Sequence, residues 1–194
     1  MQTLLRSVAV MNQLLLLQAI AFATHKHRFQ RRKDGKTPYI NHPIHVALIL
    51  SEIGHVEDGA ILAAAVLHDT VEDTDTTLDE IEAHFGARVR SLVAEVTDDP
   101  RRSPSEQKQH QLDHAAELSI GATLIRIADK TSNVTDLYEA PAENWSVARR
   151  QSYLLWAEAM IARCRPVNAA LEKNFATIAQ KAREQLGMVT NTAA

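Results

Sequence analysis

Apolar residues recur at helical spacing along most of the chain, and no segment shows the sustained two-residue alternation of strands joined by hairpin turns. The six glycines and six prolines fall mainly between the apolar segments and mark their ends. No internal repeat is present. The pattern therefore predicts an all-α fold, a single domain over residues 1–194 built as a bundle of about eight to ten helices.

The segment 56–73 is apolar almost all round in its middle, which predicts the central helix of the bundle. Gly54 is the predicted C′ residue of the helix before it, and Thr77 with Glu80 predicts a capping box that opens the helix after it. The predicted helices run approximately over 4–29, 43–53, 56–73, 78–85, 87–99, 121–139, 145–163 and 166–185, with an exposed helix within 100–117.

The first 27 residues combine an early arginine, an apolar stretch and the triplet AFA at 21–23, and so faintly resemble a secretory signal. Asn12, Gln13 and Gln18 interrupt the apolar stretch. This interruption favours an amphipathic core helix over a signal. The stretch is also too short and too polar to span a bilayer, so we predict no membrane association.

Composition and charge are those of an ordinary globular protein, with 45% hydrophobic and 23% charged residues and a net charge of −3. This small charge gives no global field that would favour nucleic acid or an anionic membrane as a partner. The single cysteine, Cys164, excludes an intramolecular disulfide and a cysteine-rich zinc site, and a cytoplasmic location is expected. No heptad seam is evident, so the oligomeric state is left open.

Candidate chemistry is concentrated where the apolar segment ends, in the sequence HDTVED. His68 and Asp69 follow the apolar run directly, and Glu72 and Asp73 come one turn later. Because neighbouring carboxylates repel one another and resist desolvation, a divalent cation is the first candidate to hold them there. On a continuous helix His68 would share a face with Glu72, and Asp69 with Asp73.

Further candidate ligands lie in two other helices. Asp129 and Asn133 have the same four-residue spacing in an otherwise apolar segment, and His42 precedes the proline at which another helix begins. Imidazole and carboxylate together suit Mn, Fe, Zn or Mg, and a set without cysteine favours a catalytic site. Such an ion lowers the pKa of a coordinated water, and nearby acidic groups could orient that water or carry its proton.

The order of these residues resembles the H…HD…D pattern of the HD-domain metal-dependent phosphohydrolases. Over residues 14–156 the chain also resembles the hydrolase domain of the RelA/SpoT family, and in particular its small stand-alone alarmone hydrolases, of which the metazoan SpoT homologue is one. The stretches that carry this resemblance are RRKDGKTPYINHP, VLHDTVEDTDTTLDEIEAHFG, LVAEVTDD and IADKTSN.

The resemblance implies an HD-domain helical bundle and Mn²⁺-dependent removal of the 3′-pyrophosphate from (p)ppGpp, giving GDP or GTP plus pyrophosphate. From ligand types alone, Fe or Zn would serve as well as Mn. The basic loop before the second helix is by itself suited to a polyphosphate ligand. The implied roles are metal ligation by His42, His68, Asp69 and Asp129, catalysis by Glu72 and Asp73, and substrate binding by Arg32, Lys33 and Asn133.

The chain departs from the family pattern at two positions. Ser132 stands where the family often has an aromatic residue or histidine, and Thr135 where it often has arginine. The synthetase domain of long family members is absent, so we expect hydrolysis without synthesis. Two alternatives stay open: the same chemistry on another phosphorylated nucleotide such as NADPH, and a non-catalytic nucleotide-binding module. The intact acidic pair disfavours the second.

Other polar and aromatic residues have less specific interpretations. His27 is predicted to be solvated, and the pair His110 and His114 lacks the third ligand of a metal site. Tyr39 fits either a nucleotide contact or the core, and Lys130 either a phosphate contact or a helix surface. Trp145, Tyr153 and Trp156 are predicted to pack the C-terminal helices.

Overall fold

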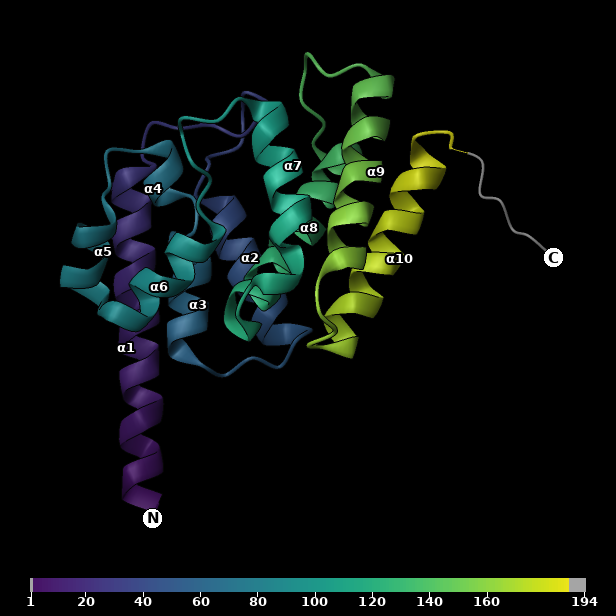
Figure 1. Cartoon of the computed structure of the whole chain (residues 1–194). Coiled ribbons are helices and arrows are strands. Elements are labelled where there is room, and N and C mark those ends of the chain that lie inside the picture. Colours follow the sequence, from purple (N-terminus) through teal and green to yellow (C-terminus); the bar gives the residue numbers. More distant parts are fainter. Residues whose placement is uncertain (1, 189–194) are drawn as a thin grey trace.

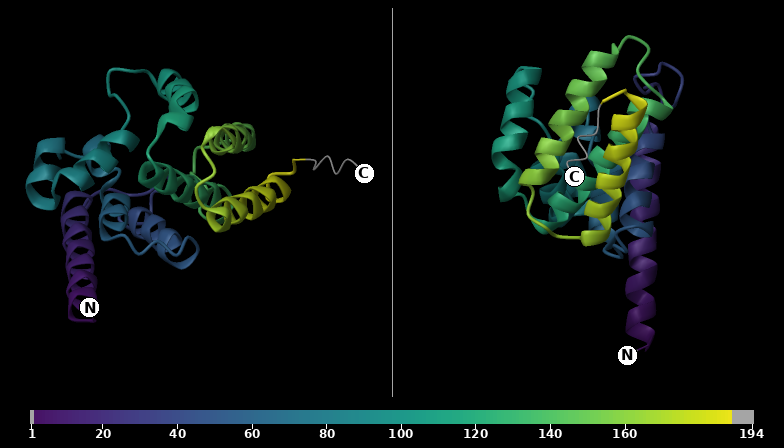
Figure 2. Two further views of the ribbon diagram at one scale, coloured as in Figure 1. Left: turned by 60° about the horizontal axis from the view of Figure 1, so that its bottom comes forward. Right: turned by 90° about the vertical axis from the view of Figure 1, so that its right-hand side faces the viewer.

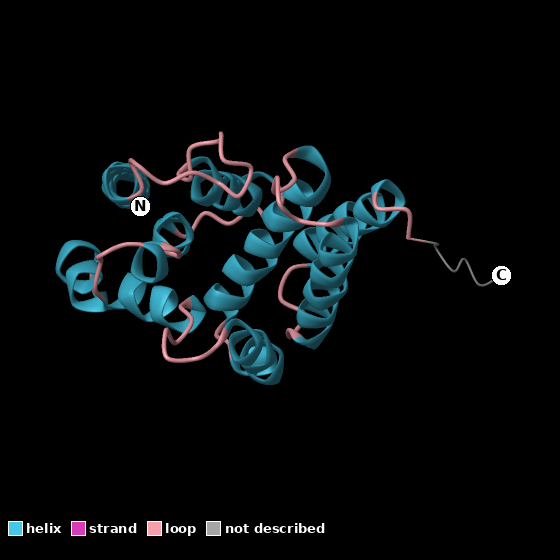
Figure 3. Ribbon diagram, turned by 90° about the horizontal axis from the view of Figure 1, so that it is seen from above, coloured by secondary structure: helices cyan, strands magenta, loops and turns pink. Residues whose placement is uncertain are grey.

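The computed structural model describes residues 2–188, and within them helices and loops account for the whole fold apart from one isolated bridge between Arg31 and Pro38 (Figures 1 and 3). The prediction of an all-α bundle is confirmed. The elements are α1 (Gln2–Lys26), α2 (Asn41–Glu52), α3 (Gly59–Leu67), α4 (Thr70–Asp73), α5 (Leu78–Phe85), α6 (Ala87–Val96), α7 (Pro104–His114), the 3-10 helix η1 (Ala115–Glu117), α8 (Ile120–Glu139), α9 (Val147–Arg163) and α10 (Ala169–Gln185).

α3 and α8 form the centre of the bundle. Every residue of α3 except Ala60 is buried, and the helix packs against α1, α2, α6 and α8. α8 is buried over most of its length and packs in addition against α9 and α10. Side chains at the end of α3 and in the middle of α8 are therefore held by buried helices that contact several neighbours.

α1 packs on α3 through its C-terminal part, where Ala19 and Ala23 are buried, while its N-terminal part extends beyond the bundle (Figure 2). Gly59 permits the close approach, because a Cβ atom there would lie 2.7 Å from Asn12 Oδ1. The predicted core helix is thus confirmed for its C-terminal part. Among the side chains of α1 that the structure describes, from residue 10 onward, the exposed large apolar ones are Val10, Met11, Leu14 and Leu17.

The predicted central helix over 56–73 is wrong in one respect, since it breaks at His68 and Asp69 into α3 and α4. At the break, His68 Nδ1 lies 2.8 Å from Ala65 O and Thr70 Oγ1 donates to Leu67 O at 2.6 Å. Such side-chain bonds compete with helix continuation. The predicted shared face of His68 and Glu72 rests on a continuous helix that does not form.

Two helix ends also differ from prediction. Gly54 follows α2, but the left-handed conformation falls on His55, with φ 51°. Thr77 accepts the amide of Glu80 as predicted, yet the Glu80 carboxylate pairs with Lys26 of α1 at 3.1 Å. A tertiary ion pair has therefore taken the group that would complete the capping box.

Candidate active site

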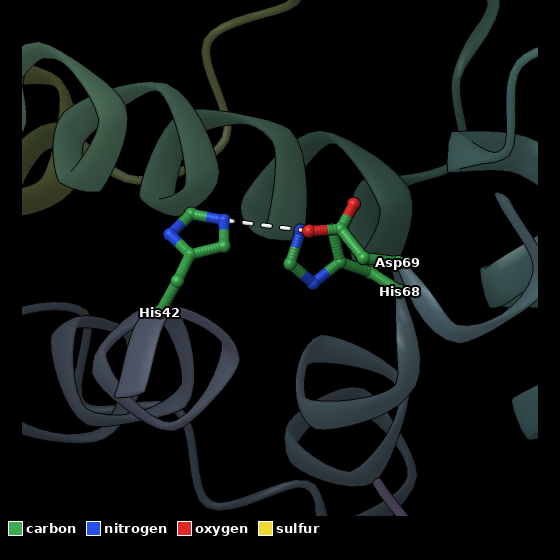
Figure 4. Close-up of side chains that lie close together, drawn as sticks. All are labelled: His42, His68 and Asp69. Carbon is green, nitrogen blue, oxygen red and sulfur yellow. Dashed lines mark ion pairs between the residues drawn. The ribbon is translucent and has the colours of Figure 1, made fainter. Parts of the chain in front are cut away.

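A cluster of two histidines and two aspartates forms where three helices meet. His42 lies in the first turn of α2, His68 and Asp69 between α3 and α4, and Asp129 in the middle of α8. Figure 4 shows the two imidazoles and the Asp69 carboxylate converging from different elements. His42, His68 and Asp129 are buried, and one ligand atom from each of His42, His68 and Asp69 lies within 4.8 Å of the others.

Each histidine presents its Nε2 atom to both carboxylates. His42 Nε2 is 3.2 Å from Asp129 Oδ1 and 3.6 Å from Asp69 Oδ2. His68 Nε2 is 3.1 Å from Asp69 Oδ2 and 3.7 Å from Asp129 Oδ1. The four side chains that the sequence predicts as metal ligands are therefore brought together in one cluster.

The hydrogen bonds behind the rings leave the Nε2 atoms available to a cation. His68 Nδ1 faces a carbonyl, Ala65 O, so it keeps its proton, and Nε2 is the nitrogen whose lone pair a cation would take in exchange for a proton. His68 Nε2 is buried and has no hydrogen-bond partner in the described residues. A divalent cation between these nitrogens and carboxylate oxygens would satisfy them all, so this donor set fits such an ion.

Charge balance in the cluster supports the same fit. Burial alone would lower the pKa of His68, but Asp69 and Asp129 raise it well above its usual value. Burial alone would raise the pKa of Asp129, but Lys130 and the two histidines hold it well below the usual range. The carboxylates are ionised and attract positive charge, so binding of a cation would displace the His68 proton.

A hydrogen-bonded layer supports Asp69 and Asp73 from behind. Tyr39 Oη donates to Asp69 Oδ2 at 2.7 Å, and Gln30 Nε2 donates to Asp73 Oδ2 at 2.9 Å. His27 Nδ1 lies 2.6 Å from Gln30 Oε1, which fixes the orientation of that amide. The prediction that His27 is solvated was wrong, because its ring stacks on Tyr39 and is only 2% exposed.

The acidic pair of α4 lies at the edge of the cluster, on the same cavity. Glu72 Oε1 accepts the Asp98 amide at 2.5 Å. Partial burial, followed by the charge of Asp69, raises the pKa of Glu72 to about 7, although its side chain stays accessible to solvent. Glu72 and Asp73 are thus placed on one wall of a cavity that His42, His68, Asp69 and Asp129 also line.

This cavity has a volume of about 390 Å³ and is lined by both acidic and basic side chains. The acidic ones belong to the cluster and to the α4 pair. The basic ones suit the oxygens of a phosphorylated ligand. These basic side chains are Arg31, Arg32, Lys33, Lys108, Arg126 and Lys130.

The three residues predicted to bind substrate, Arg32, Lys33 and Asn133, all line this cavity. Arg32 Nη2 donates to Asn133 Oδ1 at 2.8 Å and to Asp136 Oδ2 at 2.6 Å. Asn133 Nδ2 donates to Asp129 Oδ1 at 2.6 Å, which confirms their predicted proximity on α8. Burial, and then the charge of Arg32, lower the pKa of Lys33. An incoming anion would relieve this crowding of positive charge.

The comparison with known proteins identifies the family. The sequence matches the HD domain family over residues 19–162. The chain belongs to the HD-domain family. Membership in a family of metal-dependent hydrolases accords with a divalent ion, and His42, His68 and Asp69 are the candidate ligands that the described residues bring closest together.

Several relatives of this HD-domain protein are described as guanosine-3′,5′-bis(diphosphate) 3′-pyrophosphohydrolase MESH1. The Xenopus tropicalis protein is 51% identical over 159 residues, which are 81% of this chain and 89% of the relative. The Homo sapiens protein is 52% identical with the same coverage. Among solved structures, one described as a metazoan orthologue of SpoT that hydrolyses ppGpp superimposes with a TM-score of 0.83 and 40% identity, covering 90% of this chain and 97% of that chain.

Part of the cavity wall of the HD-domain protein consists of residues for which the sequence predicted other positions. Lys130 is buried, with Nζ 2.9 Å from Asp129 Oδ2, and is not a surface lysine. Trp156 and Tyr153 line the cavity, and Lys108 of α7 lies over both rings, 5.1 and 5.6 Å from their centroids. No spacing in the sequence links α7 to α9, so only the tertiary structure reveals this wall.

The two departures from the family pattern lie outside the cavity. Ser132 Oγ is 3.0 Å from His42 Nδ1, and Thr135 Oγ1 donates to Thr131 O at 2.9 Å. Neither residue lines the cavity wall. Within the described part of the HD-domain protein, no helix has the length and apolarity required to cross a bilayer.

Proposed function

We propose that this HD-domain protein is a metal-dependent hydrolase that removes the 3′-pyrophosphate of (p)ppGpp and releases GDP or GTP plus pyrophosphate. The observation that carries the proposal is the cluster of His42, His68, Asp69 and Asp129 in a cavity that six basic side chains also line. The described activity of relatives that are about half identical supplies the choice of substrate.

The four clustered side chains would hold one divalent ion, with Mn²⁺ as the proposed metal. The His68 Nε2 lone pair and the ionised carboxylates are the donors that such an ion requires. When bound, the ion supplies Lewis acidity, which lowers the pKa of a water molecule and offsets phosphate charge. The same ligands would accept Fe or Zn, so the identity of the metal is to be determined by measurement.

Glu72 and Asp73 would orient the attacking water and move its proton. A carboxyl group whose pKa is about 7 can take up and release a proton near neutral pH, which suits Glu72 to general base and acid steps. Asp73 is held in place by Gln30, whose Nε2 donates to Asp73 Oδ2. The water would give its proton to Glu72 as it attacks phosphorus, and the nucleoside 3′ oxygen would leave with a proton returned from the pair.

The basic side chains of the cavity would bind the substrate's phosphates. Arg32 is fixed by bonds from Nε and Nη2 to Asp136 and from Nη2 to Asn133, so a phosphate oxygen would bind its Nη1 group. An anion would favour the charged form of Lys33, because burial, and then the charge of Arg32, lower its pKa. Asn133 would act mainly by holding Arg32 beside Asp129.

The experiment that tests this function compares substrates on one preparation. Protein stripped of metal and reloaded with Mn²⁺ is incubated with ppGpp, pppGpp and NADPH, and the products are separated by anion exchange, with Asp69→Ala as the control. Release of GDP or GTP with stoichiometric pyrophosphate by the wild type alone supports the proposal. Phosphate release from NADPH alone would overturn the choice of substrate, and binding without turnover would overturn catalysis.

A further inference from the structure

We infer that Ser132 and His45 are positioning residues for the candidate metal ligand His42. The inference rests on the proposed metal-dependent function. Ser132 Oγ lies 3.0 Å from His42 Nδ1 and 3.1 Å from His45 Nδ1, so one hydroxyl joins two imidazoles. Ser132 and His42 are buried at 2% and 4% exposure, whereas His45 is half-buried.

Ser132 has a single hydroxyl hydrogen, and this hydrogen determines which of His42 and His45 donates and which accepts. A serine hydroxyl donates one hydrogen bond and can accept others. It can therefore donate to only one of the two Nδ1 atoms, and the other Nδ1 must carry its own proton and donate to Oγ. The proton positions of His42 and His45 are thus coupled through Ser132.

Only one direction leaves His42 able to bind a cation. If His42 Nδ1 donates to Ser132 and Ser132 donates to His45, then His42 Nε2 presents a lone pair toward Asp69 and Asp129. In the reverse direction, His42 Nε2 carries a proton toward Asp129 Oδ1, 3.2 Å away, and cannot ligate a metal. Metal binding by His42 therefore requires the first arrangement, in which His45 Nδ1 accepts the Ser132 hydroxyl.

Neighbouring hydroxyls on α8 show that the Ser132 contacts are specific. Thr131 Oγ1 donates to Ile127 O, and Thr135 Oγ1 donates to Thr131 O, each the carbonyl four residues earlier. This back-bonding is the usual choice for a hydroxyl inside a helix. Ser132 instead contacts two histidines of α2. The serine at this position, where the chain departs from the family pattern, therefore has a positioning role in this chain.

Metal affinity measures the contribution of the hydroxyl. Isothermal titration of metal-stripped protein with Mn²⁺ should give a dissociation constant about 10- to 100-fold higher for Ser132→Ala than for wild type, the usual effect of removing such a partner. Ser132→Thr should restore binding. Thr131→Val, which removes the adjacent buried hydroxyl, is the matched control and should bind as wild type does. Thermal unfolding in EDTA verifies that each variant is folded.

The role of His45 is tested with two variants, one that keeps a hydrogen-bond acceptor for Ser132 and one that lacks it. Asn places an amide oxygen close to the position of Nδ1, so His45→Asn should retain affinity, whereas His45→Leu should weaken Mn²⁺ binding by about tenfold. In ¹⁵N-histidine spectra of protein loaded with diamagnetic Zn²⁺, His45 should carry its proton on Nε2. A His45 proton on Nδ1 would overturn the proposed direction.

These results separate the inference from the proposed function. Equal Mn²⁺ affinity in wild type and Ser132→Ala would overturn the inference and leave the hydrolase proposal standing. Failure of the wild type to bind any divalent ion would overturn both. Loss of affinity in Thr131→Val equal to that in Ser132→Ala would also overturn the inference, since the effect would then belong to α8 as a whole.

Discussion

Tyr39→Phe removes one hydrogen bond from the candidate metal centre and little else. Tyr39 Oη donates to Asp69 Oδ2 at 2.7 Å, and the variant keeps the ring that stacks on His27. Burial, followed by the carboxylates of Asp69 and Asp73, raises the pKa of Tyr39 far above its usual value. The hydroxyl therefore stays a donor throughout the pH range in which the protein can be assayed.

The size of the effect follows from the charge on Asp69. Asp69 is ionised, since His68 and His42 hold its pKa below the usual range although burial opposes them. A hydrogen bond to a charged group contributes roughly 1.5–3 kcal/mol. Because about 1.4 kcal/mol is a factor of ten, Tyr39→Phe should lower Mn²⁺ affinity or kcat by about 10- to 100-fold.

The assay measures both quantities separately. Calorimetry on metal-stripped protein gives the Mn²⁺ dissociation constant, and pyrophosphate release from ppGpp at saturating Mn²⁺ gives kcat. Because the Tyr39 hydroxyl does not titrate, the ratio of wild-type to variant rates should be constant from pH 6 to pH 9. Unchanged affinity together with unchanged kcat would refute the reasoning, as would a ratio that varies strongly with pH.

Three further outcomes are expected. Gln30→Leu removes the donor to Asp73 Oδ2 and should lower kcat by about tenfold with Mn²⁺ affinity unchanged, and weaker metal binding would contradict this assignment. Burial raises the pKa of Glu72 from 4.5 to about 7, so between these values the folded metal-free chain holds a proton that the unfolded chain has lost. The free energy of unfolding therefore falls as pH rises through that range. Glu72→Gln should reduce the fall in melting temperature between pH 5 and pH 8 in EDTA. Gly59→Ala forces a Cβ atom against Asn12 and should lower the melting temperature by about 3–10 °C with kcat unchanged, whereas a melting temperature equal to wild type would show that α1 yields without cost.

Apolar periodicity was sufficient to predict most of the helices, because helices such as α6 and α10 bury one continuous face. It did not predict the break at His68 and Asp69, where side-chain bonds to Ala65 O and Leu67 O end α3. These bonds are local in sequence, yet helix propensity alone gives no sign of them. The break turns Asp69 into the residue that precedes α4 and sets the acidic pair on the cavity wall.

The candidate site was predicted in part. The resemblance of their order to the H…HD…D pattern predicted His42, His68, Asp69 and Asp129 together, and the structure places them in one cluster. The supporting layer was not predicted, because it depends on contacts between separate segments. His27 stacks on Tyr39 of the following loop, and Lys108 of α7 lies over Trp156 of α9.

The most direct test of the central claim measures metal content and turnover on the same sample. Metal-stripped protein should release no pyrophosphate from ppGpp, activity should rise in proportion to added Mn²⁺ and reach its plateau at one ion per chain, and Asp69→Ala should stay inactive at every metal concentration while melting as a folded protein. Pyrophosphate release by the metal-stripped protein, or undiminished release by Asp69→Ala, would contradict the assignment of this cluster as the catalytic metal centre.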